Sequence, residues 1–358
     1  MRIFVLGAGA TGGFLAQLLQ RQGHAVWCGD RNPERARRFL GPGLPCLPAN
    51  ARNLWGIVQA ARGCHLLVNA APATFNEIVL RAALRLRAHY LDMAAHLGRN
   101  PFKAEALRFH KKFLAKRRVA LINAGAAPGL TNLLVAQAAD RLDAIDQVFL
   151  RLFESTESED PVSTWSAETA FDAAVSRPAI YRQGRFRLAR RFSEPEWFHF
   201  PPPIGRVRVM LAAQDEVATL PRFIPLRDLD AKIGGNEFDR LRRWYRQGRL
   251  RPSAGMVSKR FPRTPTPRQV ARLIRRGILS NARFALAVVV RGWKKGQPLE
   301  LRWYGTVPTL YQIRVRGIWA TPITYATAHT AALFVKHFPR QLCGIYPPEA
   351  LPAEVRRA

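Results

Sequence analysis

The sequence predicts an α/β fold: a doubly wound parallel sheet followed by an α+β domain with a largely antiparallel sheet. Two observations predict this order. Short apolar runs alternate with helical patterns up to residue 123, as in a parallel sheet with helices on both faces. Beyond about residue 145 the alternation stops. The expected parts are a nucleotide-binding domain (1–124), a substrate and dimerisation domain (125–318), and a C-terminal helix and tail (319–358).

The first strand and helix are joined by a glycine motif. Ile3 to Leu6 predicts a buried strand, the pattern G-x-G-x-x-G fills residues 7–12, and Phe14 to Gln22 predicts a helix. The three glycines allow a tight turn, close approach of a pyrophosphate, and close packing of the helix on the strand. This context predicts a Rossmann-type dinucleotide site, with a flavin site or an empty glycine-rich turn as alternatives. The expected cofactor contacts in the motif are Gly7, Gly9, Ala10, Thr11 and Gly12.

The end of the second predicted strand bears on the identity of the cofactor. His24 to Cys28 predicts this strand, and Asp30 follows eighteen residues after Gly12. A carboxylate about 20 residues beyond the motif hydrogen-bonds the ribose 2′-hydroxyl of NAD. Arg31 comes next, and its guanidinium can pair with the 2′-phosphate of NADP. The sequence therefore predicts NAD or NADP and leaves both open.

Polar residues close several strands of the predicted parallel sheet. Further strands are expected at Leu44–Cys46, His65–Asn69, His89–Asp92 and Val119–Asn123, and helices at Pro33–Leu40, Ala51–Ala61, Thr74–Arg87 and Pro101–Ala115. Asn69, Asp92 and Asn123 each end a strand, and ligands of such sheets bind outside the carboxyl ends of the strands. Such residues also satisfy turn backbone, but their joint position on one edge favours a site.

The second half of the chain predicts a different pattern. Strands are expected at Gln147–Phe153, Arg206–Ala213, Ala282–Arg291, Leu299–Tyr304 and Tyr311–Arg316, an acidic turn at Glu154–Asp160, and helices at Leu133–Arg141, Trp165–Val175 and Thr321–His337.

Composition narrows the class of protein. Met1 leads directly into the first strand, the four cysteines are scattered, and the longest apolar run, Phe284 to Val290, is too short for a membrane span. We therefore expect a cytoplasmic protein with free thiols and no membrane partner. The eight histidines lack metal-ligand spacing, so we expect no metal, and no Ser/His/Asp arrangement points to hydrolysis.

The charge is strongly positive, at +31. Residues 240–283 include fourteen basic and no acidic residues, and Thr266 to Gly277 resembles the first half of a helix-turn-helix, which would suit nucleic acid. However, Val270, Leu273 and Ile274 form an ordinary core-facing stripe, and a strand-like segment follows. These features favour a structural helix over nucleic-acid binding through the basic stretch.

Several motifs together carry a resemblance to a known family. They are the glycine turn, Val68-Asn-Ala-Ala-Pro72, His89-Tyr-Leu-Asp92, Gly125-Ala-Ala-Pro-Gly-Leu-Thr-Asn132, Gly317 to Tyr325 and Cys343 to Glu349. In this order and spacing the chain resembles the saccharopine dehydrogenase-like family, which includes saccharopine reductases, lysine 6-dehydrogenases and carboxynorspermidine dehydrogenases.

The resemblance implies hydride transfer between a nicotinamide cofactor and a carbon that bears nitrogen, in a homodimer with a small amino-acid substrate. It implies that the C-terminal helix returns to the nucleotide-binding domain. It places cofactor contacts at Asn69, Ala70, Ala71, Pro72 and Gly125, and a catalytic role at Asp92. His96, four residues further on, is a candidate catalytic acid or base, with an ordinary solvent-facing histidine as the alternative. Substrate carboxylates would require arginine forks. The chain is shorter than most saccharopine reductases, which favours a smaller substrate such as lysine. A polyanion-binding protein without catalysis and a regulatory module are the alternatives.

Overall fold

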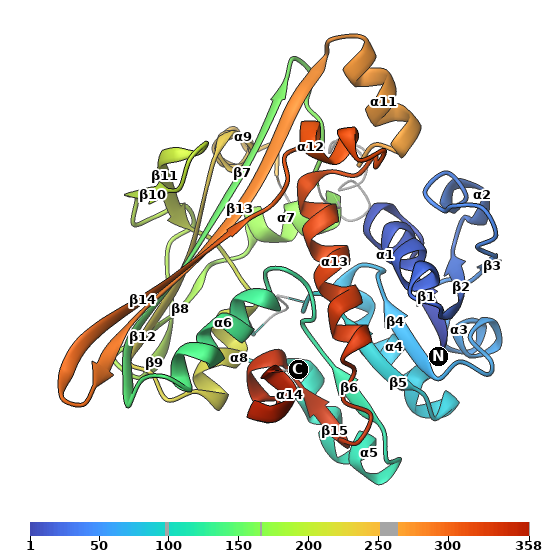
Figure 1. Ribbon diagram of the computed structural model, residues 1–358, viewed down its shortest axis with the longest axis horizontal. Coiled ribbons are helices and arrows are strands. Elements are labelled where there is room, and N and C mark those ends of the chain that lie inside the picture. Colours follow the sequence, from blue (N-terminus) through green and yellow to red (C-terminus); the bar gives the residue numbers. More distant parts are fainter. Residues whose placement is uncertain (97–99, 165–166, 251–263, 358) are drawn as a thin grey trace.

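The computed structural model describes residues 1–358 apart from 97–99, 165–166, 251–263 and 358. Two sheets lie on either side of one long helix, α13 (Pro322–Lys336) (Figure 1). Ala328 and Ala331 of α13 pack into the core of the first sheet, whereas Ile323 and Ala326 pack against the core of the second. The helix therefore couples the two halves of the molecule.

The first sheet is parallel throughout, with the strand order β15-β6-β5-β4-β1-β2-β3. Its strands are β1 (Arg2–Leu6), β2 (Ala25–Asp30), β3 (Cys46–Pro48), β4 (Leu66–Asn69), β5 (His89–Asp92), β6 (Val119–Leu121) and β15 (Gly344–Tyr346). Ile3, Phe4 and Val5 are fully buried because helices cover both faces, which explains the continuous apolar run. The predicted doubly wound sheet is confirmed, and the C-terminal tail adds β15 as an edge strand.

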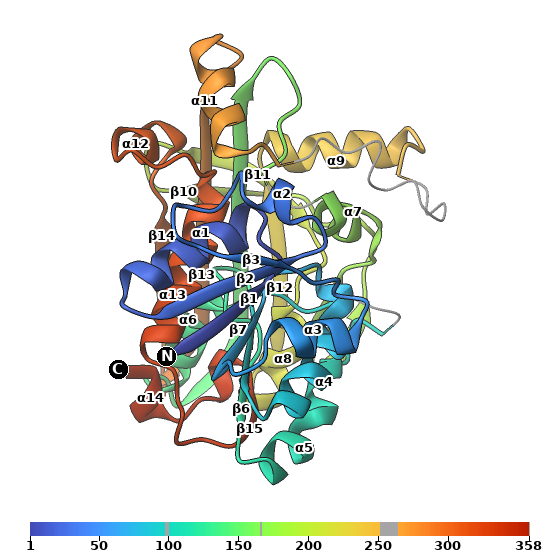
Figure 2. The ribbon, with the colours of Figure 1, turned by 90° about the vertical axis from the view of Figure 1, so that its right-hand side faces the viewer.

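Figure 2 shows α1 (Ala10–Arg21) and α13 on one face of this sheet, and α3 (Leu54–Ala60) and α4 (Asn76–Leu86) on the other. The C-terminal helix α13 thus packs on this face of the first sheet. The ring of Phe14 on α1 stacks on Tyr325 of α13 with centroids 6.0 Å apart. The remaining short elements here are α2 (Pro33–Ala36), η1 (Ala73–Phe75), η2 (Glu105–Phe109), α5 (His110–Ala115) and α14 (Ala353–Arg357).

The helix predicted at Pro33–Leu40 is wrong in length, because α2 ends at Ala36. The chain then turns so that Phe39 is buried against Gly13 of α1, and the Phe39 carbonyl accepts a hydrogen bond of 2.9 Å from Gln17 Nε2. A continued helix would carry Phe39 away from this contact. Similarly, the helix expected at Pro101–Ala115 is divided into η2 and α5.

The second sheet has the order β10-β11-β12-β7-β13-β14, with β8 and β9 attached beside β12. Within this second sheet, the β12–β7 pairing is parallel and the other pairings of its described strands are antiparallel. The sheet is therefore largely antiparallel, as predicted. The strands are β7 (Ala144–Ser158), β8 (Ala179–Arg182), β9 (Arg185–Leu188), β10 (Glu196–Phe200), β11 (Gly205–Leu211), β12 (Asp228–Gly234), β13 (Leu279–Lys294) and β14 (Gln297–Thr306). The helices are α6 (Leu130–Ala139), α7 (Ala167–Val175), α8 (Glu216–Phe223), α9 (Asn236–Arg246), α11 (Pro267–Arg275), α12 (Leu310–Val315) and η3 (Pro348–Ala350).

Two expectations for this half are wrong. The acidic turn expected at Glu154–Asp160 is mostly strand, because β7 continues to Ser158 and pairs with β13 along its whole length. The strand expected at Tyr311–Arg316 is the helix α12. Its start is fixed by Thr309, whose side chain and that of Gln312 cap each other's backbone N–H groups. The alternating apolar residues favoured a strand, but the capping interaction stabilises the start of a helix, and the helix forms.

The basic stretch contains a structural helix, as predicted. In α11, Val270 is buried with Leu273 and Ile274 packed beside it, and the chain then enters β13 instead of a recognition helix. Residues 251–263 of the stretch lie outside the described part of the chain. Within the described residues, no helix is long and apolar enough to cross a membrane, and all four cysteines are free.

A buried polar cluster fixes the C-terminal tail to the second domain. Glu349 of η3 accepts a hydrogen bond of 3.0 Å from Asn132 Nδ2, and Thr131 Oγ1 donates to Glu216 Oε1 at 2.8 Å. Glu349 is only 3% exposed, and one of its oxygens has no hydrogen-bond partner among the described residues. Burial raises the pKa of Glu349 to about 7.

This shift predicts a pH-dependent effect of the substitution Glu349→Gln. The unfolded chain releases the Glu349 proton near its ordinary pKa of 4.5 and the folded chain only near 7, so this group lowers the free energy of unfolding as pH rises between those values. Glutamine stays neutral and keeps an acceptor for Asn132. The variant should match the wild type at pH 4 and exceed its stability by roughly 2–3 kcal/mol at pH 8 in urea unfolding. The exposed Glu354→Gln should show no such difference, and an equal effect at both pH values would refute the assignment.

Candidate active site

The three motif glycines differ in their surroundings. Gly7 has φ +91°, and a Cβ there would lie 2.5 Å from the Ala71 nitrogen. A Cβ on Gly12 would lie 1.9 Å from the Gly7 carbonyl oxygen, so this glycine lets α1 pack against the strand. A Cβ on Gly9 would meet nothing within 4 Å. The space beside Gly9 is therefore open to a ligand.

The start of α1 fits a diphosphate. Gly9 is the N-cap residue and no side chain caps this end, so the first N–H groups of the helix are available to an anion. Asp30 lies beside the turn, where its Oδ2 accepts a hydrogen bond of 3.1 Å from the Ala8 N–H and its Oδ1 accepts one of 2.9 Å from the Asn32 N–H. The geometry of the turn thus agrees with a nucleotide-binding role.

A cavity of about 470 Å³ extends from the glycine turn and is the candidate cofactor cavity. Gly7, Gly9, Asp30 and Arg31, which the sequence analysis proposed as cofactor contacts, line it. Arg35 and Arg52 also line it. The glycine motif could not predict these two arginines, because both lie far from it in the sequence: Arg35 is in α2, and Arg52 follows β3.

A second cavity, of about 250 Å³, lies between the carboxyl ends of the first sheet and the second sheet, and is the candidate substrate cavity. It is lined on one side by Thr11, Asn69 and residues 93–95, and on the other by Leu152 and Ile233. The two cavities share four residues, and these are Ala70, Ala71, Pro72 and Thr74. The segment predicted to contact the cofactor is therefore the place where the two cavities meet.

The polar strand ends come together as predicted, and Asn76 joins them. Asn69 and Asp92 are in register on β4 and β5. Asn69 Nδ2 donates to Asn76 Oδ1 at 2.8 Å, and Asn76 Nδ2 donates to Asp92 Oδ2 at 3.3 Å and to the Ala94 carbonyl at 2.8 Å. Asn69 and Asn76 line the substrate cavity. Asn76 was missed in the sequence because it lies in the first turn of α4, not at a strand end.

Asp92 lies behind the substrate cavity and does not line it. Its Oδ2 accepts a hydrogen bond of 2.9 Å from the Tyr90 hydroxyl, and its Oδ1 accepts one of 2.7 Å from the Asn123 N–H. Burial raises the pKa of Asp92 to about 7, against the opposing effect of these hydrogen bonds. Asp92 is therefore connected to the cavity through the hydrogen bond that it accepts from Asn76.

The other predicted site residues are placed around these two cavities. His96 is a little over a third exposed, with Nδ1 3.9 Å from Asp172 Oδ2, and Asp172 lines the substrate cavity. Gly125 does not line either cavity; its N–H donates to the Pro128 carbonyl at 3.0 Å, and a Cβ on it would press on the Met93 carbonyl at 2.8 Å. Gly125 thus shapes the loop whose residues Ala127 and Pro128 line the substrate cavity.

Charge in the substrate cavity differs from what the resemblance implied. Arginine forks for substrate carboxylates were expected, yet among the described residues no arginine or lysine lines this cavity. Its ionisable lining side chains are Glu154, Asp172 and Asp215. They come from β7, α7 and the residue before α8, so no local sequence pattern brings them together.

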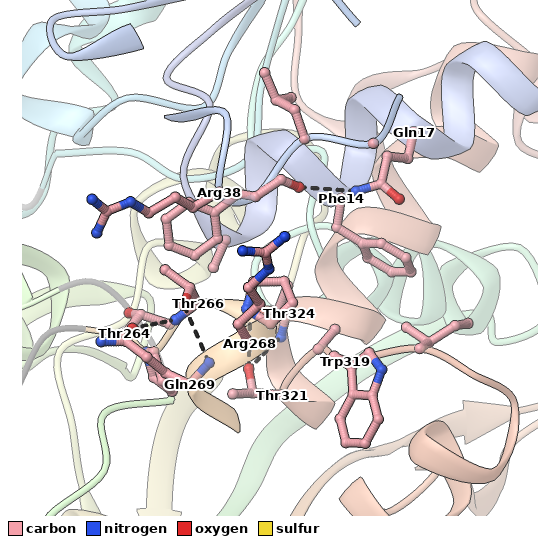
Figure 3. Close-up of a pocket in the computed structure, with 18 of the residues that line it drawn as sticks. Phe14, Gln17, Arg38, Thr264, Thr266, Arg268, Gln269, Trp319, Thr321 and Thr324 are labelled. Atoms are coloured by element: carbon pink, nitrogen blue, oxygen red, sulfur yellow. Dashed lines mark hydrogen bonds between the residues drawn. The ribbon is translucent and has the colours of Figure 1, made fainter. Parts of the chain in front are cut away.

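A third cavity, of about 770 Å³, lies between α1, the segment after α2, and α11 (Figure 3). Figure 3 shows Arg268 of α11 reaching toward α1 near Phe14, and Arg38 across the cavity. Ala10 and Thr324 lie on its border, and Thr324 also lines the substrate cavity. Ala10, which the motif assigned to the cofactor, therefore lies where this arginine-lined cavity begins.

Comparison with known proteins agrees with this geometry. Residues 3–126 match the family model "Saccharopine dehydrogenase NADP binding domain". The whole chain is similar to the apo saccharopine dehydrogenase (L-Glu forming) from Saccharomyces cerevisiae, with a TM-score of 0.69, 12% identity, and coverage of 99% of this chain and 95% of that one. A diaminopimelate (DAP) dehydrogenase from C. glutamicum is also similar, at 11% identity, the same coverage and a TM-score of 0.49. The resemblance is thus borne out for residues 3–126, which match an NADP-binding domain of the saccharopine dehydrogenase type, and the chain as a whole shares the fold of the yeast saccharopine dehydrogenase.

Proposed function

We propose that the chain is an NAD(P)-dependent oxidoreductase that interconverts an amine and an imine, acting on a C–N bond of a basic amino acid or a related amine. The observation that carries this is the meeting of the cofactor cavity and the substrate cavity at Ala70–Pro72. A nucleotide held at the glycine turn can reach the second cavity along this segment. The similar yeast protein is described as a saccharopine dehydrogenase, which supports chemistry at a C–N bond.

The residues of the chain would divide the work as follows. The turn at residues 7–12 and the start of α1 bind the diphosphate of the cofactor. When bound, the nicotinamide supplies the hydride acceptor or donor. Asp92 is a positioning residue that holds the Asn76 amide at the wall of the substrate cavity. His96, next to Asp172 and accessible to water, is proposed to exchange the proton with solvent.

A panel assay tests this function. The purified full-length chain is incubated with NADP or NAD and with lysine, saccharopine and alkyl diamines, and reduction of the nicotinamide is followed by its absorbance. Reduction that depends on an amine is the expected result. If NADPH binds but none of these amines is oxidised and no matching imine is reduced, the proposed reaction is wrong.

The arginines of the cofactor cavity favour NADP over NAD. Arg31, Arg35 and Arg52 line the cavity beside Asp30, whose oxygens already accept backbone hydrogen bonds. Guanidinium groups bind phosphate with charge-assisted hydrogen bonds. The double substitution Arg31→Ala and Arg35→Ala should raise the KM for NADP about tenfold or more, equivalent to about 1.4 kcal/mol, and leave that for NAD nearly unchanged.

Steady-state kinetics with both nucleotides measure this preference. The exposed Arg62→Ala variant, which removes an arginine from outside the cofactor cavity, is the control for the loss of positive charge. Equal changes in both KM values would show that these arginines do not recognise the 2′-phosphate.

A further inference from the structure

The substrate cavity is acidic in a strongly basic protein. The sequence has 56 Lys+Arg residues against 25 Asp+Glu. Nevertheless, each ionisable side chain among the described residues that line this cavity is a carboxylate, from Glu154, Asp172 or Asp215. Asp92 adds a fourth carboxyl group directly behind the Asn76 side of the cavity. The lining of this cavity is therefore acidic, whereas the protein as a whole is strongly basic.

These carboxyl groups are held in place by the fold. Asp215 is 7% exposed, and its Oδ2 accepts a hydrogen bond of 2.8 Å from the Ala95 N–H, which joins the second domain to the loop after β5. Glu154 is 4% exposed on β7. Burial raises the pKa of Asp215 well above its ordinary range, and the neighbouring Glu216, Asp92 and Asp172 add to this shift. A cation in the cavity would relieve this repulsion between like charges.

A buried hydroxyl gives an independent indication of a ligand. Thr164 lines the substrate cavity and is 5% exposed, yet its Oγ1 has no hydrogen-bond partner among the described residues. Its backbone is fixed, because its carbonyl oxygen accepts a hydrogen bond of 3.0 Å from Thr321 Oγ1. A hydroxyl oxygen can accept a hydrogen bond from an ammonium group, and a buried polar group without a partner costs free energy.

Apolar side chains form the rest of the wall. Leu152, Ile233, Phe284 and Ile323 line the same cavity. Such a wall suits methylene groups, whereas the carboxylates suit the charged ends of a ligand. A substrate carboxylate in this cavity would face three carboxyl groups, and none of the described lining residues is an arginine or lysine that could pair with it, so its binding would carry a large electrostatic cost.

From this cavity we propose, resting on the proposed function, that the substrate is an alkyl diamine or polyamine that carries no carboxylate. One protonated nitrogen is held by the acidic side chains and Thr164, and the carbon next to the other nitrogen reacts. In the oxidative direction that carbon gives a hydride to NADP⁺, its nitrogen loses a proton, and a C=N bond forms. The products are the iminium ion, NADPH and one proton, so atoms and charges balance.

The test compares 1,5-diaminopentane with lysine, which differs from it only by the carboxylate group. Isothermal titration into the full-length protein, saturated with NADPH, measures binding without turnover. The diamine should bind at least about tenfold more tightly than lysine, and saccharopine should bind still more weakly. Equal or tighter binding of lysine or saccharopine would overturn the proposal.

Variants locate the binding in this cavity. Asp215→Asn should weaken diamine binding about tenfold or more, and so should Asp172→Asn, whose side chain is more than a third exposed and is therefore less important for folding. Asp239→Asn, an exposed acid on α9, should leave binding unchanged. If Asp172→Asn and a folded Asp215→Asn both bind the diamine as the wild type does, the proposal fails. The ranking of ligands tests the substrate class, and the panel assay tests the reaction, so failure of one is distinguishable from failure of the other.

Discussion

Replacing Gly9 by aspartate is expected to abolish nucleotide binding and to leave the fold intact. A side chain at this position meets nothing within 4 Å, and the backbone of Gly9, with φ −79°, suits any residue. Aspartate is also a favourable N-cap residue, so α1 should not be weakened. However, its carboxylate would occupy and repel the diphosphate at the start of α1. We expect the Kd for NADPH to rise at least about 100-fold, equivalent to about 2.7 kcal/mol.

Isothermal titration and a thermal melt measure the two halves of this prediction. The matched control is Gly9→Ala, which adds a Cβ without charge and should keep much more of the affinity. If the Gly9→Asp variant binds NADPH with the affinity of the wild type, the diphosphate binds elsewhere. Loss of affinity together with a lower melting temperature would instead indicate a disturbed fold.

Replacing Gly12 by alanine is expected to have the opposite effect, loss of stability. The added Cβ would lie 1.9 Å from the Gly7 carbonyl oxygen and 2.8 Å from the Ala70 Cβ. The Gly7 oxygen is a backbone atom and cannot rotate away as a side chain could. The clash is therefore relieved only if α1 moves away from β1, which would disturb the packing of the buried core between them. Overpacking typically costs about 1–3 kcal/mol, and we expect a cost near the upper end of this range because the clash is with a backbone atom.

Denaturant unfolding of the Gly12→Ala variant measures this cost. Gly9→Ala, three residues earlier in the same turn, provides the comparison, because its Cβ has open space. Equal stability of the two alanine variants would contradict the close packing of α1 on the strand.

The sequence predicted the first sheet well because its signals are local. Apolar runs, the glycine turn and the polar strand ends at Asn69 and Asp92 each depend on a few neighbouring residues, and parallel strands bring those ends to one edge. Errors arose where a local signal competed with another. Tyr311, Ile313 and Val315 alternate as in a strand, but the cap formed by Thr309 and Gln312 starts a helix.

The charge of the substrate cavity could not be predicted, for a physical reason. Glu154 was predicted to lie in an acidic turn, but it belongs to β7, which pairs with β13, and its side chain is buried. Asp172 and Asp215 reach the same cavity from separate helical segments. The positions of all three side chains depend on contacts between segments that are far apart in the sequence. Such contacts cannot be recognised from local patterns in a single sequence. The expectation of arginine forks came from the family resemblance, whereas the acidic lining is a property of this chain.

The most direct test is a crystal structure of the chain with NADPH. The diphosphate should contact backbone N–H groups at Gly9 and Ala10, and the nicotinamide should lie beside Ala70–Pro72 at the entrance to the acidic cavity. A nucleotide bound instead in the arginine-lined cavity between α1 and α11, or a glycine turn without any ligand, would contradict this prediction.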